Sequence, residues 1–343
     1  MSAADEPLVG VVTPVYNGAA FLRECIESVI AQTYRNWRYT IVNNRSTDDT
    51  LEIARHYARL DSRIRVYDSP DFLPIIDNHN RAVGLLDPQA TYCKPLMADD
   101  WLYPECIASM VALAQSYPSI GLVCSYARTR DEVRFTCLGG ESGTTSFLSG
   151  RDACRRAILA RCYFFGTPTT MLIRADLIRK RGPFYNPANL HADTESCYDI
   201  LRESDFGFVH RVLAFFRVHE SSMTSQVSGF DSLFVGSLYA LAKYGRCYLT
   251  EAEFAASYAS RMHEYYARLA AAVLRPSGRD FWAYHRAKLA SVGAEFNRMR
   301  LARSVAAYAA RRCLSPVAVA HSIWTWWGAA LRRHRKPSKD PAL

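Results

Sequence analysis

The feature that most constrains the fold of this chain is a regular alternation of short apolar runs with amphipathic helical patterns. The apolar runs have the length of buried strands and fall at residues 8–12, 39–42, 64–67, 92–97 and 120–125. Between them, apolar side chains recur at helical spacing, as in the set Phe21, Leu22, Cys25, Ile26, Val29 and Ile30, and a helix is also expected near residues 80–86. A further strand is expected at residues 169–174. Repeated strand-helix units of this length predict an α/β fold: a mostly parallel, doubly wound, Rossmann-like sheet with helices on both faces.

Polar segments follow directly after these predicted strands. They occupy residues 13–17, 43–49, 68–71 and 99–100. Because ligands of such sheets bind at the carboxyl ends of the strands, we expect the functional site among these segments. No G-x-G-x-x-G pattern follows the first strand, which argues against a dinucleotide-dependent dehydrogenase.

Two adjacent carboxylates, Asp99 and Asp100, follow the fourth predicted strand. Carboxylate oxygens suit hard cations, so the pair is a candidate site for Mg²⁺ or Mn²⁺. A cation held there would neutralise a diphosphate leaving group. On spacing alone, a surface turn or a helix cap is an open alternative.

Two later segments carry further candidates. Asp193 and Glu195 lie near the start of a predicted helix, where Asp193 is a candidate general base; an acidic first turn that suits the helix dipole is the alternative. After the last predicted strand, His219 is a candidate metal ligand and Arg217 a candidate partner of phosphate. A lone histidine is more often structural, so its role stays open at this point.

Six motifs occur in one order along the chain. They are residues 12–17 (VTPVYN), 42–50 (VNNRSTDDT), 97–100 (MADD), 166–174 (GTPTTMLIR), 192–193 (AD) and 217–219 (RVH). This ordered set resembles the family 2 glycosyltransferases, which are inverting enzymes with a GT-A fold. The resemblance covers about residues 7–226 and implies a nucleotide-sugar donor together with a divalent cation, Mg²⁺ or Mn²⁺.

The resemblance also implies a role for each matching residue. For the donor nucleotide, it points to Pro14, Tyr16, Asn44, Arg81 and Asp99, with Asn44 standing where the family has an aspartate that faces the base. It implies that Asp100 and His219 approach the metal and that Asp193 is the catalytic base.

Two departures from the family pattern matter. The chain has Asn43 and Asn44 where an aspartate pair is common, and an amide both donates and accepts hydrogen bonds whereas a carboxylate only accepts. Met97 replaces the first aspartate of the usual Asp-x-Asp pattern. The nucleobase preference and the metal affinity are therefore open.

The function that the resemblance implies is transfer of a single sugar, with inversion, to a hydroxyl of a glycan or lipid-linked acceptor, in cell-surface polysaccharide synthesis. A nucleotidyltransferase would need a glycine-rich loop after the first strand, which residues 13–17 do not provide. A catalytically silent relative that binds a nucleotide sugar as a scaffold or regulator is the remaining alternative. Turnover of the donor, rather than its binding, separates the two.

Charge divides the chain unevenly. Residues 230–343 contain eighteen Lys and Arg against seven Asp and Glu, whereas the preceding residues are close to neutral. We expect a catalytic domain at residues 1–228 and a helical, basic region at residues 229–343. Its segment 314–331 is too interrupted to span a bilayer, and its aromatic and basic composition is typical of an interfacial helix on an anionic membrane. Packing on the catalytic domain and contact within a homo-oligomer are alternatives, and nucleic acid is not expected as a partner.

The ten cysteines form no C-x-x-C pair, and the first residues resemble no secretory signal. Reduced thiols and a cytoplasmic location, peripheral on the inner face of the membrane, are therefore expected.

Overall fold

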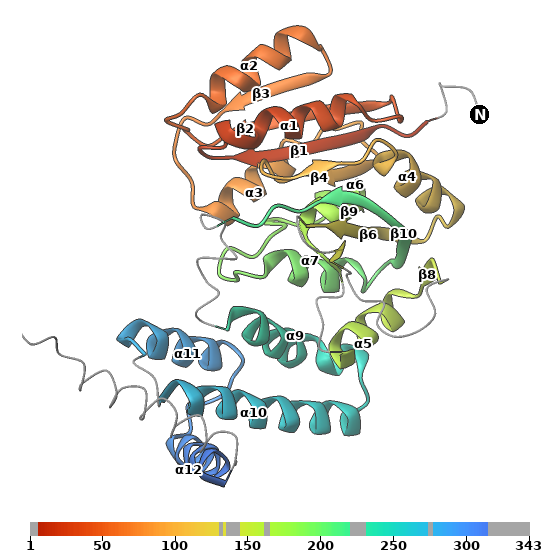
Figure 1. Ribbon diagram of the computed structural model, residues 1–343. Helices are drawn as coiled ribbons and strands as arrows, with labels where there is room; N and C mark the ends of the chain where they lie inside the picture. Colours follow the sequence, from red (N-terminus) through yellow and green to blue (C-terminus); the bar gives the residue numbers. More distant parts are fainter. Residues whose placement is uncertain are drawn as a thin grey trace, which may run out of the picture. The chain divides into compact units, whose positions relative to one another are not determined.

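A computed structural model describes residues 6–129, 133–134, 145–160, 165–219, 231–273 and 277–314. Contacts within the chain divide it into two compact units, residues 1–254 and 255–343. The first unit holds a single sheet with helices on both faces, and the second is helical (Figure 1).

The sheet of the first unit has the strand order β3-β2-β1-β4-β9-β6-β10-β5, with β7 beside β6 and β8 beside β10. The strands are β1 (Val9–Val15), β2 (Trp37–Asn43), β3 (Ile64–Asp68), β4 (Tyr92–Pro95), β5 (Trp101–Leu102), β6 (Ile120–Arg128), β7 (Val133–Arg134), β8 (Phe147–Leu148), β9 (Met171–Arg174) and β10 (Asp205–Phe215). Strands β3, β2, β1 and β4 are mutually parallel, and β6 and β10 share their direction. The predicted mostly parallel α/β sheet is confirmed.

Strand β9 is the main departure from that prediction. It lies between β4 and β6 and runs antiparallel to both. The apolar run at 169–174 predicts a strand but carries no information on its direction, which depends on the path of the chain before it.

The helices of the first unit are α1 (Ala19–Ile30), α2 (Thr50–Leu60), α3 (Ile75–Gly84), α4 (Cys106–Ser116), α5 (Gly150–Ala160), α6 (Ala175–Arg179), α7 (Ala192–Ile200) and α9 (Ser232–Tyr248). The buried side chains of α1, α2 and α4 share one core with alternate residues of β1, among them Val9, Val11 and Val15. Gly10 points to the opposite face, where an added Cβ would lie 2.3 Å from Leu86, just beyond α3. The side chains of β1 thus alternate between the two faces of the sheet, and helices cover both faces.

Helix α3 begins earlier than the predicted 80–86. It starts at Ile75, directly after Pro74, and ends at Gly84. Proline next to the first helical position is compatible with a helix start, because its missing N–H has no partner there in any case.

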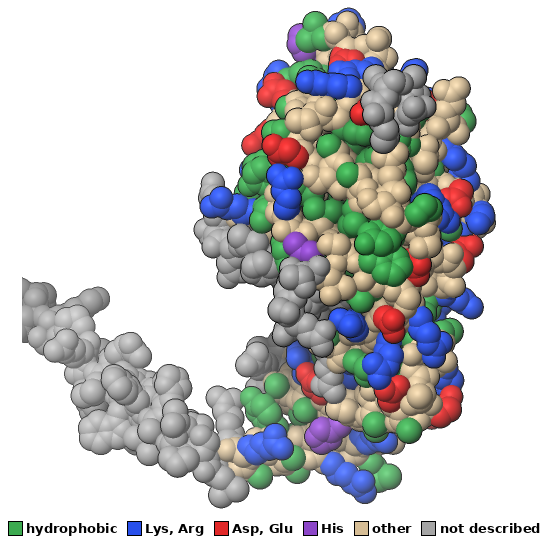
Figure 2. Space-filling model, turned by 90° about the vertical axis from the view of Figure 1, so that its right-hand side faces the viewer, with side chains coloured by type: hydrophobic (Ala, Val, Ile, Leu, Met, Phe, Trp, Pro, Cys, Tyr) green, Lys and Arg blue, Asp and Glu red, His purple; other side chains and the backbone are tan. Residues whose placement is uncertain are grey.

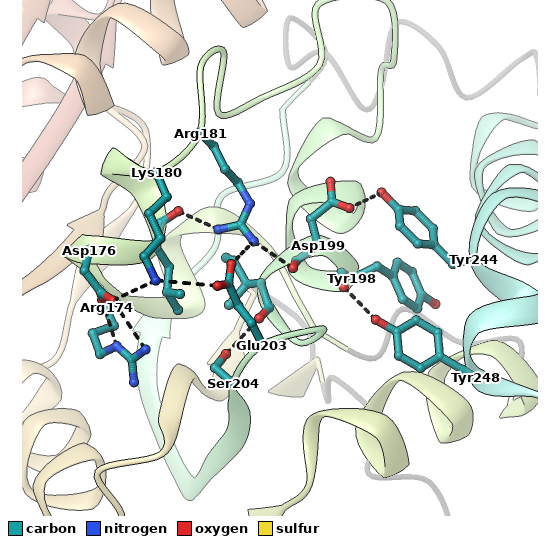
Figure 3. Close-up of polar contacts among 12 residues, drawn as sticks. Arg174, Asp176, Lys180, Arg181, Tyr198, Asp199, Glu203, Ser204, Tyr244 and Tyr248 are labelled. Carbon is teal, nitrogen blue, oxygen red and sulfur yellow. Dashed lines mark hydrogen bonds and ion pairs between the residues drawn. The ribbon is translucent and has the colours of Figure 1, made fainter.

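Helix α9 belongs to the first unit, although the domain boundary was expected near residue 228. Two tyrosines of α9 donate hydrogen bonds to α7 (Figure 3): Tyr244 Oη to Asp199 Oδ1 (2.9 Å) and Tyr248 Oη to the carbonyl of Tyr198 (2.8 Å). The Tyr198 and Tyr244 rings also stack at 5.0 Å. These contacts between α7 and α9 explain why the compact unit extends beyond residue 228 to 254.

The second unit contains most of α10 (Glu251–Val273), together with α11 (Arg279–Ser291) and α12 (Arg298–Leu314). Tyr265 Oη and His285 Nδ1 lie 2.7 Å apart, and the Asn297 amide donates to Tyr266 Oη (2.7 Å). In the part of the chain that the structure describes, no helix has both the length and the apolar composition to cross a membrane. The predicted interfacial segment 314–331 lies, apart from its first residue, outside the described residues.

The molecular face in Figure 2 carries Lys and Arg side chains interspersed with Asp and Glu. Mixed charge of this kind is typical of an ordinary solvated protein surface.

Candidate active site

The loops after β1 and β2 are hydrogen-bonded to each other at the carboxyl edge of the sheet. Asn17, which has a φ of 50°, accepts a bond from the Thr47 amide on Oδ1 (2.8 Å) and donates its own amide to Ser46 Oγ (2.9 Å). The Gly18 amide donates to Thr50 Oγ1 (2.8 Å). These bonds give the edge a fixed backbone frame.

Two exposed aromatic rings lie next to each other at this edge of the sheet. Tyr16, which follows β1, is 49% exposed, and Phe72, which follows β3, is 57% exposed. Their ring centroids lie 4.9 Å apart in an edge-to-face arrangement. Pro14 is buried within β1. Sequence reasoning missed Phe72, although an aromatic residue among polar residues at a strand end is a visible signal.

Asn44 has a different partner from the nucleobase that was expected of it. Its Nδ2 donates to the Leu73 carbonyl (2.8 Å), the Leu73 amide donates to its Oδ1 (2.9 Å), and the residue is buried. Both ends of the amide are therefore used inside the protein, next to Phe72. The physical effect of Asn44 in this structure is to hold the Phe72 segment in place.

Arg81 lies at the end of α3 and reaches the end of β3. Its Nη1 donates to Tyr67 Oη (3.2 Å) and to Ser69 Oγ (3.4 Å). The structure thus brings Arg81 to the carboxyl edge, beside the segment that carries Phe72.

Asp100 is almost completely buried, at 2% exposed. Its Oδ2 accepts a hydrogen bond from Thr169 Oγ1 (2.5 Å) and its Oδ1 accepts one from the Arg217 amide (2.9 Å). Burial, reinforced by the neighbouring charge of Asp99, raises the pKa of Asp100 to about 8. Its hydrogen bonds come from a hydroxyl and an amide, not from a cationic side chain, so the carboxylate lacks directly bonded positive charge.

Asp99 is the more accessible carboxylate of the pair. Its Oδ2 lies 2.9 Å from His219 Nε2, and both side chains are partly exposed. The structure therefore joins His219, from the segment after β10, to the acidic pair after β4.

Arg217 is bound to the protein itself. Its Nε donates to the Asp99 carbonyl (2.8 Å), its Nη2 donates to Glu24 Oε2 (2.5 Å), and its guanidinium lies 4.6 Å from the centre of the Phe21 ring. These contacts tie the segment after β10 to α1 and to the acidic pair. A phosphate would have to compete with Glu24 for this guanidinium.

Asp193 lies in the first turn of α7 and is partly buried. Burial, with a further contribution from the charge of Asp193, raises the pKa of Tyr185. The Tyr185 and His79 rings lie 6.0 Å apart, and His79 in turn interacts electrostatically with Asp99, while its burial lowers the pKa of His79 to about 4. The charge of Asp193 therefore acts on Tyr185 and that of Asp99 acts on His79, and the Tyr185 and His79 rings are neighbours.

Glu195, two residues after Asp193, is held by side chains of the protein. It is buried and accepts hydrogen bonds from Asn189 Nδ2 (2.6 Å), Tyr239 Oη (3.2 Å) and Lys243 Nζ. Burial alone would raise the pKa of Glu195, but these hydrogen bonds, with that of Lys243 the largest, hold it below its ordinary value. Of the two carboxylates in this turn, Glu195 anchors α7 to α9.

The donor set fits a divalent cation that also binds a substrate phosphate. Within the described ranges, no three His, Cys, Asp or Glu side chains form a closed metal cage. Mg²⁺ and Mn²⁺ sites in phosphate-handling enzymes commonly use one or two carboxylates and complete their coordination with phosphate oxygens and water. Asp99 and His219 match that chemistry, and so does Asp100, whose carboxylate has no hydrogen bond from a cationic side chain.

Comparison with known proteins gives the family. The model of Glycosyl transferase family 2 matches residues 10–181. An uncharacterized glycosyltransferase of Rickettsia typhi is 27% identical over 248 residues, covering 69% of this chain and 73% of the relative. A PGL/p-HBAD biosynthesis glycosyltransferase of Mycobacterium bovis is 31% identical over 163 residues, covering 47% of this chain and 62% of the relative.

Two solved structures have the same fold. S. aureus TarS 1–349 in complex with UDP-GlcNAc superposes with a TM-score of 0.62 at 13% identity, covering 88% of each chain. The mannosyltransferase PcManGT from Pyrobaculum calidifontis, in complex with GDP-Man and Mn²⁺, superposes with a TM-score of 0.54 at 15% identity, covering 96% of this chain and 82% of the other. The chain is therefore a member of glycosyltransferase family 2 with the GT-A fold.

Proposed function

We propose that this protein is an inverting glycosyltransferase that moves one sugar from a nucleoside-diphosphate sugar to a hydroxyl of a glycan or lipid-linked acceptor in surface polysaccharide synthesis. The observation that carries the proposal is the arrangement at the carboxyl edge: Asp99 Oδ2 lies 2.9 Å from His219 Nε2, and the adjacent Asp100 accepts a hydrogen bond from the Arg217 amide. The nucleotide sugars named with TarS and PcManGT support the donor class. We assign catalysis to residues 1–228 and a membrane or oligomer contact to residues 229–343.

The nucleotide half of the donor is proposed to lie over the aromatic rings. Tyr16 and Phe72 offer exposed ring surface. Any of the nucleobases can stack on such a surface, because every base has an aromatic face. Arg81 contributes positive charge from the adjacent end of α3. Asp99 is proposed to contact the ribose and the diphosphate.

The diphosphate half is proposed to lie at Asp99 and His219, backed by Asp100. Mg²⁺ or Mn²⁺, held by these residues, would neutralise the diphosphate and so stabilise it as a leaving group. Asp99 and His219 are partly exposed, and the buried Asp100 is proposed as a further ligand of the cation.

The chemical step assigned to the chain itself belongs to Asp193. Its carboxylate takes the proton from the acceptor hydroxyl while that oxygen attacks the anomeric carbon. The bond from the anomeric carbon to the diphosphate oxygen breaks, and its electron pair leaves with the nucleoside diphosphate. One displacement gives one inversion of configuration.

Calorimetric titration with UDP, GDP, dTDP and CDP, each with Mn²⁺ and then with EDTA, tests the proposal. We expect one nucleotide to bind in a metal-dependent way and Asp99→Ala to abolish the metal dependence. Asp176→Asn is a matched control, because Asp176 pairs with Arg174 on the protein surface (Figure 3). Binding of no nucleotide would overturn the proposal, and binding without any turnover of the corresponding donors would favour a silent relative.

A further inference from the structure

Lys94 is a completely buried lysine that the proposed reaction does not use. It lies on β4 with none of its surface exposed. Its Nζ donates to the carbonyls of Met171 (2.9 Å) and Thr169, and burial lowers the pKa of Lys94. Placing an ammonium group in a protein core is costly, so such a group is retained where its hydrogen bonds have a structural or functional task.

The position of Lys94 explains what its ammonium group does. The antiparallel ladder between β4 and β9 pairs Tyr92 with Arg174 and Cys93 with Ile173, and then stops. Pro95, further along β4, has no N–H with which to continue a ladder. The ammonium of Lys94 thus joins β4 to the start of β9 and to the preceding 3₁₀ turn, η2 (Pro168–Thr170), where backbone pairing has ended.

Thr169, in that turn, carries the connection to the acidic pair. Its hydroxyl accepts a hydrogen bond from the Met97 amide (3.2 Å) and donates one to Asp100 Oδ2 (2.5 Å), and the residue is fully buried. Because the Met97 amide can only donate, the hydroxyl hydrogen is directed at Asp100. The Arg217 amide holds the other oxygen, so the carboxylate is fixed at both ends.

We propose that Lys94 and Thr169 are positioning residues for the donor site: Lys94 holds the backbone of the η2 turn, and the hydroxyl of Thr169 orients the carboxylate of Asp100. This inference rests on the proposed function. The side chain that orients Asp100 then comes from the η2 turn, about seventy residues after Asp99 and Asp100 in the sequence. Neither residue touches the substrate, so their replacement should act through the affinity for metal and nucleotide.

The test compares Thr169→Val, Thr169→Ser and Lys94→Met in the full chain. Cys93→Ala is the matched control, because Cys93 is a buried neighbour on β4 with no hydrogen bond to the η2 turn or Asp100. The probe is Mn²⁺, titrated by electron paramagnetic resonance with the diphosphate that the wild type binds best. Loss of a hydrogen-bonding partner behind a metal ligand costs about 10- to 100-fold in metal affinity. We expect such a loss for Thr169→Val and Lys94→Met, near wild-type affinity for Thr169→Ser, and no change for Cys93→Ala.

Hydrogen exchange of the Arg217 amide gives a second readout that needs no ligand. We expect faster exchange in Thr169→Val than in Thr169→Ser, because a displaced carboxylate no longer accepts that amide. Unchanged exchange and unchanged Mn²⁺ affinity in Thr169→Val would overturn the inference, and so would equal losses in Thr169→Ser. If Lys94→Met does not fold, the two Thr169 variants still decide the matter. Absence of nucleotide binding in the wild type would instead reject the proposed function, and with it the role of Lys94 and Thr169 in donor binding. The exchange data would still test whether Thr169 positions Asp100.

Discussion

Replacing Lys243 with methionine should loosen the helix that carries Asp193. Lys243, on α9, donates to the carboxylate of Glu195, whose side chain is only 4% exposed. Lys243→Met leaves that carboxylate with hydrogen bonds from neutral groups alone, those of Asn186, Asn189 and Tyr239. The link between α7 and α9 is weakened as a result.

The magnitude follows from the burial of each partner. Removing one member of a buried ion pair costs about 3–5 kcal/mol. The Lys243 side chain is 43% exposed, so solvent screening reduces the expected loss to about 1.5–2.5 kcal/mol. For a unit of this size, that loss corresponds to a fall in Tm of about 3–10 °C.

The pH dependence provides a second signature. In the folded protein the pKa of Glu195 is lowered from its ordinary value of 4.5. Its stabilising contribution is therefore fully present above about pH 5 and is lost as the pH falls through the folded pKa. Lys243→Met should flatten this acidic limb, because the ammonium is the largest of the groups that lower the pKa.

The assay is thermal denaturation followed by circular dichroism between pH 3 and pH 8. Lys180→Met serves as the control, because Lys180 is exposed and pairs with Asp176 and Glu203 on the surface (Figure 3). Exposed pairs contribute about 0–1 kcal/mol. Equal Tm values for the two variants, or an unaltered acidic limb in Lys243→Met, would refute the reasoning.

Three further predictions concern separate parts of the chain. Phe72→Ala should raise the donor KM about tenfold with little change in kcat, since base stacking on an aromatic ring is worth about 1–3 kcal/mol; a loss confined to kcat would contradict this. Gly236→Ala should destabilise the protein by about 1–3 kcal/mol, because the added Cβ would lie 2.4 Å from the His191 ring, whereas Gly84→Ala, with nothing within 4 Å, should be neutral or stabilising in the same denaturation assay. Replacing Arg332, Arg333, Arg335 and Lys336 together with glutamine should weaken sedimentation with phosphatidylglycerol vesicles at least about tenfold. The same change at Arg298, Arg300, Arg303 and Arg311 of α12 is the control, and equal effects of the two sets would argue against a membrane contact by the later segment.

The sequence was sufficient to predict the sheet where apolar runs are continuous. Strands β1, β2 and β6 are buried along most of their length, and such runs stand out against the helical spacing that follows them. The direction of β9 was not predictable in the same way, because a four-residue strand fits a sheet in either direction. The start of α3 was missed although Pro74 followed by Ile75 and Ile76 is a visible start signal.

The candidate site was predictable in its residue types but not in their partners. Asn44 and Glu195 lie in motifs that point to chemistry, yet their side chains bond to Leu73 and Lys243, which are 29 and 48 residues away in the sequence. Lys94 is the opposite case, a residue outside the motifs that turned out to matter. A lysine inside an apolar run was the available signal, and only the structure reveals its two carbonyl partners. Long-range contacts decide whether a polar residue faces a ligand or the protein, and spacing along the chain does not record them.

The central claim is that Asp193 acts as the base in a single displacement, and one comparison tests it most directly. It measures kcat for sugar transfer and Kd for the donor in the wild type and in Asp193→Asn. A positioned base contributes about 10²- to 10⁴-fold to the rate, so kcat should fall by that factor while the donor Kd changes less than about threefold. Normal turnover in Asp193→Asn, or loss of donor binding in place of turnover, would contradict the account.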